Sequence, residues 1–534
     1  MTGAAWDALV VGGGHNGLVT AGLLARAGLR TCVLERRDIV GGACVTEEIA
    51  PGFRASTAAY IASMMRPEVI RDLGLTRYGL EMTPCDPLQF VPARNGNALY
   101  YWQDARRTAA GIERISARDA RAFLAFDIEI KRLAGYLEPF FLEPPPPIDE
   151  GVRALPDLGR IALRLRRISE ADIGRLTRFL TASVMDLVES RFERPDVRNL
   201  VACSNVLGVH GGPMTQGTAS GLVFHSLSGG DTLSQGFMGH VKGGMGAITQ
   251  ALALAVRAAG GTVRTGAPVA RILIENGRAA GVALASGEEI RARVVASNAD
   301  PKRTFLGLLD AGHLDDEFRA AVAAIKMAGP CAKINFALSE APVVPQMPPD
   351  ATPAMLSDFT ICPGTDYHER AWDEAKHGRA STHPYVDCVV PTHLDPGLAP
   401  AGRHVLTAFV NYAPYRLASG TWATEREHLA DRVTETITEF APNFGRSVLA
   451  RDILSPVDLE ERFGLTEGNI FHGDLNLGQL FLGRPLPGWS RYRTPIRALY
   501  LCGAGTHPGG GVTGAPGFNA ARQILRDWKT KQLR

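Results

Sequence analysis

The chain has 534 residues, which is more than one ordinary hydrophobic core needs and suits two intertwined domains. Its formal charge is only +2, and no lysine- and arginine-rich block is interleaved with aromatic residues, so we expect no nucleic-acid partner. Eight cysteines without a C-x-x-C pair fit a reducing compartment, so we expect a cytoplasmic protein with neither a disulfide framework nor a metal site.

The first predicted element is a buried parallel strand at residues 7–11, because the run is short, apolar and β-branched at its end. A glycine-rich turn follows it, Gly12-Gly13-Gly14-His15-Asn16-Gly17, and then a helix over residues 17–27 that Gly28 ends. Glycines at these spacings permit a tight turn, a close approach of backbone to a pyrophosphate, and close packing of the helix on the strand. The turn therefore predicts a phosphate site at the start of this helix.

A second strand is predicted over residues 30–34, and Glu35 follows it directly. This is about twenty residues after the glycines, where an acidic side chain usually hydrogen-bonds the hydroxyls of a ribose. Strand, turn, helix, strand and acid agree with one another, so the start of the chain predicts a dinucleotide-binding unit. A carboxylate at Glu35 disfavours a ribose with a 2′-phosphate.

The next part of the chain changes in character. After a mixed loop at residues 43–63 and a short helix at 67–73, Pro and Asn-Gly turn signals separate short β-like runs, which predict antiparallel strands of a second domain. The strands are expected at residues 88–91 and 98–102, and helices at 117–137 and 173–190. Between the helices, the proline-rich segment 137–147 is interpreted as an exposed loop or lip.

Nucleotide-domain character returns at Lys242-Gly243-Gly244-Met245-Gly246. A helix at residues 247–259, a strand from 262, a hairpin of 269–274 with 280–285, and a strand at 289–296 are predicted after it. Residues 301–441 mix helices and strands, with 333–338 and 405–411 as the best strands. This region is interpreted as the second half of the inserted domain.

The last signal is a buried strand at residues 498–502, a glycine-rich turn from Gly503 to Gly514, and a helix that begins near Ala515 with Pro516 in its first turn. So many glycines imply a backbone that lies almost against a flat ligand. The start of the new helix points its positive dipole end at that ligand.

Together these motifs resemble the phytoene desaturase-like branch of FAD-dependent oxidoreductases, and within it the group called pyridine nucleotide-disulfide oxidoreductase domain-containing protein 2. The resemblance rests on residues 11–19, 34–37, 41–49, 51–53, 242–246 and 502–519. It implies an α/β fold of the two-dinucleotide-fold flavoprotein type, with a Rossmann-like FAD-binding domain and an inserted α+β substrate domain. The FAD-binding domain is then expected from residues 1–79, 236–300 and 451–534, and the substrate domain from 80–235 and 301–450.

The resemblance also implies FAD as the cofactor and assigns residues to it. The pyrophosphate is expected on Gly12 to Gly17, the adenosine near Glu35, Arg36 and Val269, and the flavin end on the turn from Gly503. The complete expected set is Gly12, Gly13, Gly14, His15, Asn16, Gly17, Glu35, Arg36, Gly41, Gly42, Ala43, Val269, Gly503, Ala504, Val512, Thr513 and Gly514. Disulfide oxidoreductases place a C-x-x-x-x-C pair after the Gly-Gly, but Ile49 stands where Cys44 needs its partner, so thiol chemistry is not expected.

The expected reaction is hydride transfer from a hydrophobic small molecule to flavin N5, as in a desaturase or dehydrogenase. A flavin amine oxidase and a flavin-bound, non-catalytic interaction protein are the alternatives. His507, beside the C-terminal turn, is the best-placed candidate acid–base residue, ahead of His210, His225 and His240. Residues 160–168 alternate basic and apolar side chains, which is typical of a solvated helix face or of a peripheral contact with a membrane.

Overall fold

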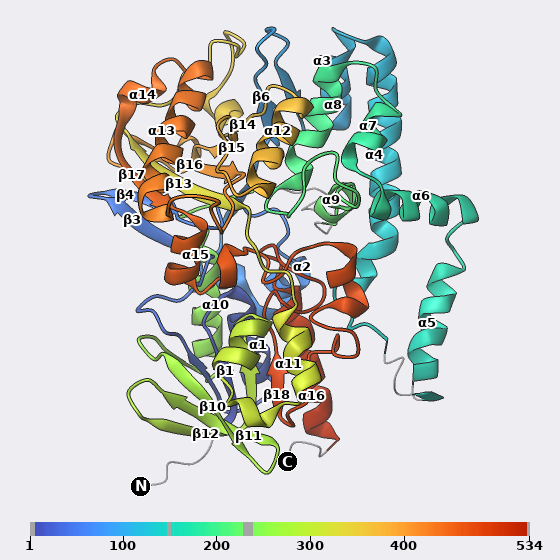
Figure 1. Ribbon diagram of the computed structural model, residues 1–534, viewed down its shortest axis with the longest axis vertical. Helices are drawn as coiled ribbons and strands as arrows, with labels where there is room; N and C mark the ends of the chain where they lie inside the picture. The colour runs from blue at the N-terminus through green and yellow to red at the C-terminus, as the bar shows by residue number, and fades with distance from the viewer. Residues whose placement is uncertain (1–5, 147–150, 153, 228–238, 531–534) are drawn as a thin grey trace.

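The computed structural model describes residues 6–146, 151–152, 154–227 and 239–530. Pro147 and the predicted domain boundary between residues 235 and 236 lie outside them. Figure 1 shows a lower sheet beside both ends of the chain, an upper sheet, and a group of helices next to the upper sheet.

The lower sheet contains the strand that leads into the first glycine-rich turn. β1 (Trp6–Val11) lies between β12 (Glu289–Ser297) and β2 (Thr31–Leu34), and the three run parallel. β9 (Thr262–Arg264) runs parallel to β2, and β18 (Leu499–Leu501) runs parallel to β12. β11 (Arg278–Leu284) pairs with β12, and β10 (Val269–Glu275) pairs with β11, both in antiparallel fashion. Three distant segments of the chain thus build the predicted Rossmann-like fold, which is confirmed.

Side chains of the lower sheet alternate between two hydrophobic layers. Ala8 and Val10 pack on the side of three helices, while Leu9 and Val11 pack on the opposite side. The helices on the first side are α1 (His15–Arg26), α10 (Gly246–Ala258) and α16 (Ala515–Lys529), and α11 (Asp316–Ala323) lies on the second. Burial on both faces explains the continuous apolar runs of these parallel strands.

The upper sheet is antiparallel except where β14 pairs with β6. In order, its strands are β17 (Val448–Leu454), β13 (Cys331–Leu338), β16 (His404–Asn411), β15 (Tyr385–Val389), β14 (Asp358–Ile361), β6 (Gln89–Val91) and β7 (Leu99–Tyr101). One face packs on α13 (Trp422–Phe440) and α14 (Phe444–Ser447) through side chains such as Ile334 and Phe336. The opposite face is therefore left for the alternate side chains, among them Lys333 and Asp387.

The helical region has its own core, in which Phe123, Phe126 and Phe179 are buried. Its helices are α3 (Ala105–Glu113), α4 (Ala117–Leu137), α6 (Glu170–Thr181), α7 (Val184–Glu189), α8 (Pro195–Ala202) and α9 (Ser220–His225). Helix α5 (Leu155–Leu165) buries none of its side chains and stands away from the other helices at the side of the molecule (Figure 1). The remaining elements are α2 (Pro67–Leu73), α12 (Thr365–Lys376), α15 (Pro456–Phe463), the hairpin of β3 (Thr46–Ala50) with β4 (Phe53–Ser56), and the pair β5 (Met82–Pro84) with β8 (Gly239–Val241).

Three local predictions were wrong. The expected loop 43–63 contains the β3–β4 hairpin, whose turn includes Gly52 at a φ of 80°. The single helix expected at 173–190 is two helices, because Ser183 caps α7 and exchanges hydrogen bonds with Asp186. The proline-rich segment is not an exposed lip over its described residues, since Phe141 and Pro145 are buried and residues 138–140 form a 3₁₀ turn.

Candidate active site

A cleft of about 300 Å³ lies at the carboxyl edge of the lower sheet. Its walls come from the turns that follow β1, β2 and β12 and from the C-terminal turn. These segments meet because the carboxyl ends of parallel strands share one edge of the sheet, which is where ligands bind in such folds.

Glycines bring the backbone close enough to form this cleft. Gly12 has a φ of 96°, in the region that L-residues rarely adopt. A Cβ atom on Gly17 would lie 2.2 Å from the carbonyl oxygen of Gly12, and one on Gly14 would lie 2.7 Å from Nδ2 of Asn298. A Cβ on Gly517 would lie 2.1 Å from the carbonyl oxygen of Asn16, so α16 is packed equally closely on α1.

Glu35 is buried at the end of β2 with its carboxylate fixed in place. One oxygen, Oε2, accepts a hydrogen bond from the backbone N–H of Gly13 at 2.7 Å. The other, Oε1, accepts from the backbone N–H of Arg37 at 2.9 Å. The carboxylate therefore ties the first turn to the end of β2, and each oxygen keeps acceptor capacity for a hydroxyl group in the cleft.

Most of the residues that the sequence assigned to a cofactor line this cleft. They are Gly12, Gly14, His15, Asn16, Glu35, Arg36, Gly41, Gly42, Ala43, Val269, Ala504 and Val512. Gly13, Gly17, Gly503, Thr513 and Gly514 do not line it. Gly17 and Gly503 lie behind the wall, and Thr513 accepts a hydrogen bond from the N–H of Ala515 at the start of α16.

Sequence reasoning missed Asn298, Arg303 and His472, which also line the cleft. Asn298 carried a signal, because it comes two residues after the strand predicted at 289–296, and ligands in such folds bind beyond the ends of strands. Arg303 and His472 carried no such sequence signal, because only the tertiary fold brings them to the wall of the cleft. Several buried polar atoms of the cleft lack a hydrogen-bond partner, namely Nε2 of His15, Oδ1 of Asn16, Nε of Arg303 and Nδ1 of His472.

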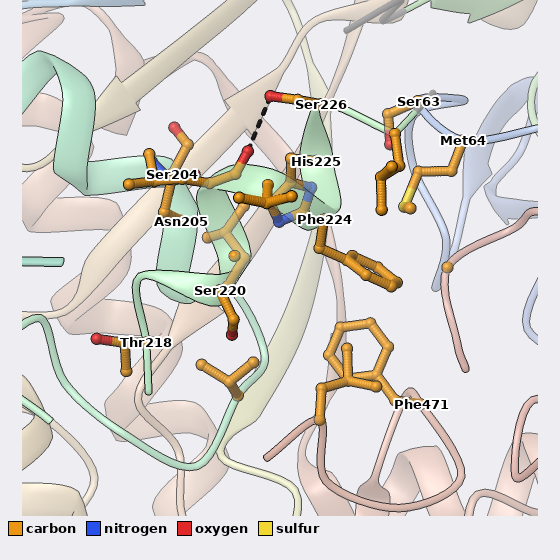
Figure 2. A pocket seen from close by; sticks show the side chains of 18 of the residues that line it. Ser63, Met64, Ser204, Asn205, Thr218, Ser220, Phe224, His225, Ser226 and Phe471 are labelled. Atoms are coloured by element: carbon orange, nitrogen blue, oxygen red, sulfur yellow. Dashed lines mark hydrogen bonds between the residues drawn. The ribbon is translucent and has the colours of Figure 1, made fainter. Parts of the chain in front are cut away.

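A second, larger cavity of about 720 Å³ lies between the upper sheet and the helical region. Much of its wall is apolar, and includes Met64, Phe126, Ile130, Leu137, Phe141, Leu222 and Phe224. Figure 2 shows the rings of Phe224, from α9, and Phe471, from the loop near the C-terminus, directed toward each other in this cavity. Seven residues line both the cavity and the cleft, so the two spaces meet at Ala59, Tyr60, Phe409, Ile470, Phe471, Gly511 and Val512.

Close to this junction, several polar side chains interact on the face of the upper sheet that is turned away from α13 and α14. Lys333 is only 2% exposed and lies with Nζ 4.1 Å from the centre of the Tyr60 ring. Asp387 accepts hydrogen bonds from the Tyr60 hydroxyl and the Thr360 hydroxyl, each at 2.6 Å. Burial lowers the pKa of Lys333 to about 7 and raises the pKa of Asp387, and each charge opposes that effect on the other group.

A family model described as flavin containing amine oxidoreductase matches residues 17–525 of the chain. The chain belongs to this flavin-containing amine oxidoreductase family. The match includes the upper sheet, the helical region and all of the lower sheet except β1, which precedes residue 17.

Relatives agree with this membership. A mouse protein named pyridine nucleotide-disulfide oxidoreductase domain-containing protein 2 is 39% identical over 98% of this chain and 94% of its own length. A lycopene-forming phytoene desaturase from a Paracoccus species is 26% identical over 98% and 97% of the two chains. The crystal structure of an oxidoreductase from Methanosarcina mazei shares the fold, with a TM-score of 0.60, 16% identity, and coverage of 97% of this chain and 100% of that one. The predicted resemblance to the phytoene desaturase-like branch is confirmed.

The protein is thus an FAD-dependent oxidoreductase, and its cleft fits the cofactor of its family. The close glycine turns leave backbone exposed where a pyrophosphate needs it, and buried polar atoms of His15, Asn16 and His472 that lack a hydrogen-bond partner are available to polar groups of a ligand. The neighbouring Cys44 is buried, donates its Sγ hydrogen to the carbonyl of Met245 at 3.3 Å, and has a pKa raised by burial to about 12. This thiol is therefore not ionised, in accord with the missing partner at Ile49.

The candidate histidines of this flavoenzyme are scattered. His507 lines neither the cleft nor the cavity, and its Nε2 is hydrogen-bonded to the carbonyl oxygen of Phe140 at 2.7 Å. Burial lowers its pKa to about 4, so its ring is neutral and links the C-terminal turn to the end of α4. His210 and His225 line the larger cavity, whereas His240 lies outside both spaces. We assign no reaction step to His507.

Proposed function

We propose that this FAD-dependent oxidoreductase removes two hydrogens from an apolar, hydrocarbon-like small molecule held in the larger cavity. The observation that carries the proposal is the direct junction between a largely apolar cavity of about 720 Å³ and the cofactor cleft. A long apolar molecule gains free energy along such a wall, at roughly 25 cal/mol for each Å² of apolar surface removed from water. The phytoene desaturase relative supports the same substrate class.

The cofactor in this proposal is held by the residues that the sequence assigned to it. Gly12, Gly14 and the start of α1 carry the pyrophosphate, Glu35 binds the ribose hydroxyls, and the C-terminal turn holds the flavin end. When bound, the flavin supplies the acceptor for a hydride. The chain orients the substrate and excludes water around it, with Phe224 and Phe471 on opposite sides of the cavity.

Anaerobic titration of the FAD-bound protein tests this function. We expect a polyene hydrocarbon such as phytoene to bleach the oxidised-flavin absorbance and to lose two hydrogens by mass spectrometry. Benzylamine and NADH serve as comparison reductants and are expected to leave the absorbance unchanged, because the cavity wall is apolar and no second complete dinucleotide motif occurs in the sequence. Bleaching by benzylamine but by no hydrocarbon would refute the proposal.

Amine oxidation is the second candidate, and one observation favours it. Tyr60 and Phe409 stack with ring centres 5.6 Å apart and line both the cavity and the cleft. An aromatic pair at this junction is a feature that an amine oxidase shares, and Asp387 nearby offers a carboxylate to an ammonium group. The titration separates the two candidates in one experiment.

We further propose that α5 contacts an anionic membrane surface. Leu155, Leu158 and Leu165 follow a helical repeat and are exposed, with Leu155 62% exposed. Basic side chains of the same segment complement anionic headgroups. Arg164 of α5 is hydrogen-bonded to Glu143, which lies two residues after Phe141 in the wall of the larger cavity, so α5 would bring this side of the cavity toward the bilayer. Across the described residues, no helix has the length and apolar character needed to span a bilayer.

Liposome flotation tests the membrane contact. We expect the protein to float with vesicles of phosphatidylcholine and phosphatidylglycerol, and the double change Leu158→Asp and Leu165→Asp to reduce the bound fraction at least about tenfold, since each charge removes apolar burial. Arg167→Glu is expected to weaken binding to these anionic vesicles and to leave binding to vesicles of phosphatidylcholine alone unchanged. Arg164 is unsuitable for this test because it forms two hydrogen bonds of 2.9 Å with Glu143.

Leu449→Asp is the matched control for the flotation experiment. Leu449 is 54% exposed on β17, in a different part of the molecule. Its change adds one negative charge at an exposed leucine, half of what the α5 double variant adds, and is expected to leave flotation unchanged. Equal flotation of the α5 variant and the wild-type protein would refute the membrane contact.

A further inference from the structure

Among the described residues, the junction of the cavity and the cleft is lined by one ionisable side chain. Of the seven residues that line both the cavity and the cleft, only Tyr60 carries a group that exchanges a proton in water. The others are aliphatic, glycine or phenylalanine residues. A proton that leaves a substrate at this junction therefore meets the Tyr60 hydroxyl first.

The hydroxyl of Tyr60 is hydrogen-bonded to the buried carboxylate of Asp387. It donates to Oδ2 of Asp387 at 2.6 Å, while Thr360 donates to Oδ1 of the same carboxylate at 2.6 Å. Asp387 also lines the substrate cavity. Short hydrogen bonds of this kind to a carboxylate are strong, so they hold the phenol and the carboxylate in a fixed relation.

The upper sheet sets this arrangement by its register. Lys333 on β13 and Asp387 on β15 both pair with Phe409 on β16, and Asp387 pairs in turn with Thr360 on β14. Directly paired residues of neighbouring strands share a face of the sheet, so these four side chains form one row. Tyr60 lies over the row, with the ammonium of Lys333 on its ring and Asp387 at its hydroxyl.

We propose that Tyr60 and Asp387 together accept the proton that the substrate loses, with Lys333 as a positioning residue that balances the charge of Asp387. This rests on the proposed removal of two hydrogens from a hydrocarbon. One carbon gives up a hydride with its electron pair to the flavin. The neighbouring C–H bond releases its proton to the Tyr60 oxygen, and the electron pair of that bond becomes the new double bond.

The proton balance closes within the pair. As the Tyr60 oxygen takes the substrate proton, its own hydroxyl proton moves to Asp387, so Tyr60 remains a neutral phenol and Asp387 becomes a carboxylic acid. The flavin is the only oxidant that the step needs. Lys333 then faces a neutral acid, which favours return of the proton to solvent before the next turnover.

Other acidic groups around Asp387 are buried, and burial favours their uncharged forms. Asp358 on β14 is also buried, and burial together with the charge of Asp387 raises its pKa well above the usual range, which favours its uncharged form. Burial likewise raises the pKa values of Cys203, Cys388 and Tyr385, and the charge of Asp387 adds to the rise in each. Among the described residues, Lys333 opposes the burial effect on Asp387 by its charge, and Asp387 and Asp452 do the same for Lys333.

Two variants that each remove one functional group test the pair. Tyr60→Phe keeps the ring over Lys333 and loses the hydroxyl, and Asp387→Asn keeps the shape and loses the base. We expect each to slow anaerobic flavin reduction by the hydrocarbon at least about 100-fold, the usual contribution of a general base, with unchanged FAD content and unchanged reduction by dithionite. Tyr367→Phe is the matched control, because the Tyr367 hydroxyl donates to the Pro384 carbonyl at 2.9 Å and its residue lines neither space.

Infrared titration of the FAD-bound protein gives a readout that needs no turnover. The infrared band of the Asp387 carboxyl group is assigned by its loss in Asp387→Asn. In Tyr60→Phe this band is expected to titrate at higher pH than in the wild-type protein, because the Tyr60 hydrogen bond stabilises the carboxylate and lowers the pKa of Asp387. Lys333→Met is expected to shift it in the same direction.

The outcomes separate this pair from the proposed function. Wild-type reduction rates in either variant, or an unshifted carboxyl band in Tyr60→Phe, would overturn the assignment of the pair while hydrocarbon oxidation stands. Reduction of the wild-type protein by an amine alone would refute the proposed function, and the infrared titration would still decide whether Tyr60 and Asp387 are coupled.

Discussion

Replacing Gly17 with alanine is expected to weaken FAD binding at least about 100-fold, which corresponds to roughly 2.7 kcal/mol. The new Cβ would lie 2.2 Å from the carbonyl oxygen of Gly12, and both partners are backbone, so neither can move aside as a flexible side chain would. Relief of the clash requires α1 to move away from β1, which also moves the turn that lines the cleft. The FAD-to-protein ratio of the purified protein, read from its absorbance spectrum, and a fluorescence titration with FAD measure the effect.

Gly174→Ala is the control for this change. Gly174 lies inside α6, and nothing is within 4 Å of the position that its Cβ would occupy. Alanine there is expected to leave FAD binding unchanged and to stabilise the protein by about 0.4–1 kcal/mol, because it lowers the entropy of the unfolded chain. Full FAD occupancy in Gly17→Ala would show that the turn after β1 does not position the cofactor.

Replacing Arg484 with methionine is expected to destabilise the protein by at least about 4 kcal/mol. Arg484 is 1% exposed, and its guanidinium donates to the backbone carbonyls of five residues: Phe471, Gly473, Asp474, Gln479 and Ala504. Methionine fills much of the same volume but leaves these buried acceptors without a donor. Lysine is not expected to rescue the protein, because one ammonium group cannot reproduce the planar fork of donors.

In Arg484→Met we expect weaker FAD binding as well as lower stability. Phe471 lines both the cavity and the cleft, and Ala504 lies in the C-terminal turn, so Arg484 connects the two segments at the junction. Thermal unfolding followed by circular dichroism and by release of FAD fluorescence measures both effects. Arg71→Met is the control, since Arg71 is exposed and, among the described residues, its side chain pairs with Asp72 alone; the change is expected to stay within about 0.5 kcal/mol. An equal melting temperature for the two variants would contradict the role given to Arg484.

Much of the lower sheet could be predicted because its signals are local. The β1 strand, the glycine turn, α1 and Glu35 occupy one short segment in which every residue type has a steric or hydrogen-bonding reason for its position. The helices at α2 and α4 also matched their predicted bounds. Prediction was weaker where a short element depends on its partners, as in β14 and β15, whose four- and five-residue runs become strands only by pairing with each other and with β16.

The sequence by itself determined the cofactor fold, because the spacing of glycines and apolar residues within single βαβ segments dictates where a backbone can approach a dinucleotide. The tertiary structure alone decided where the proposed reaction site lies. Tyr60, Lys333, Asp387 and Phe471 come from four distant segments, and no periodicity connects them. The register of the upper sheet and the packing of the loop held by Arg484 bring them together, and long-range contacts of this kind leave no local pattern in the chain.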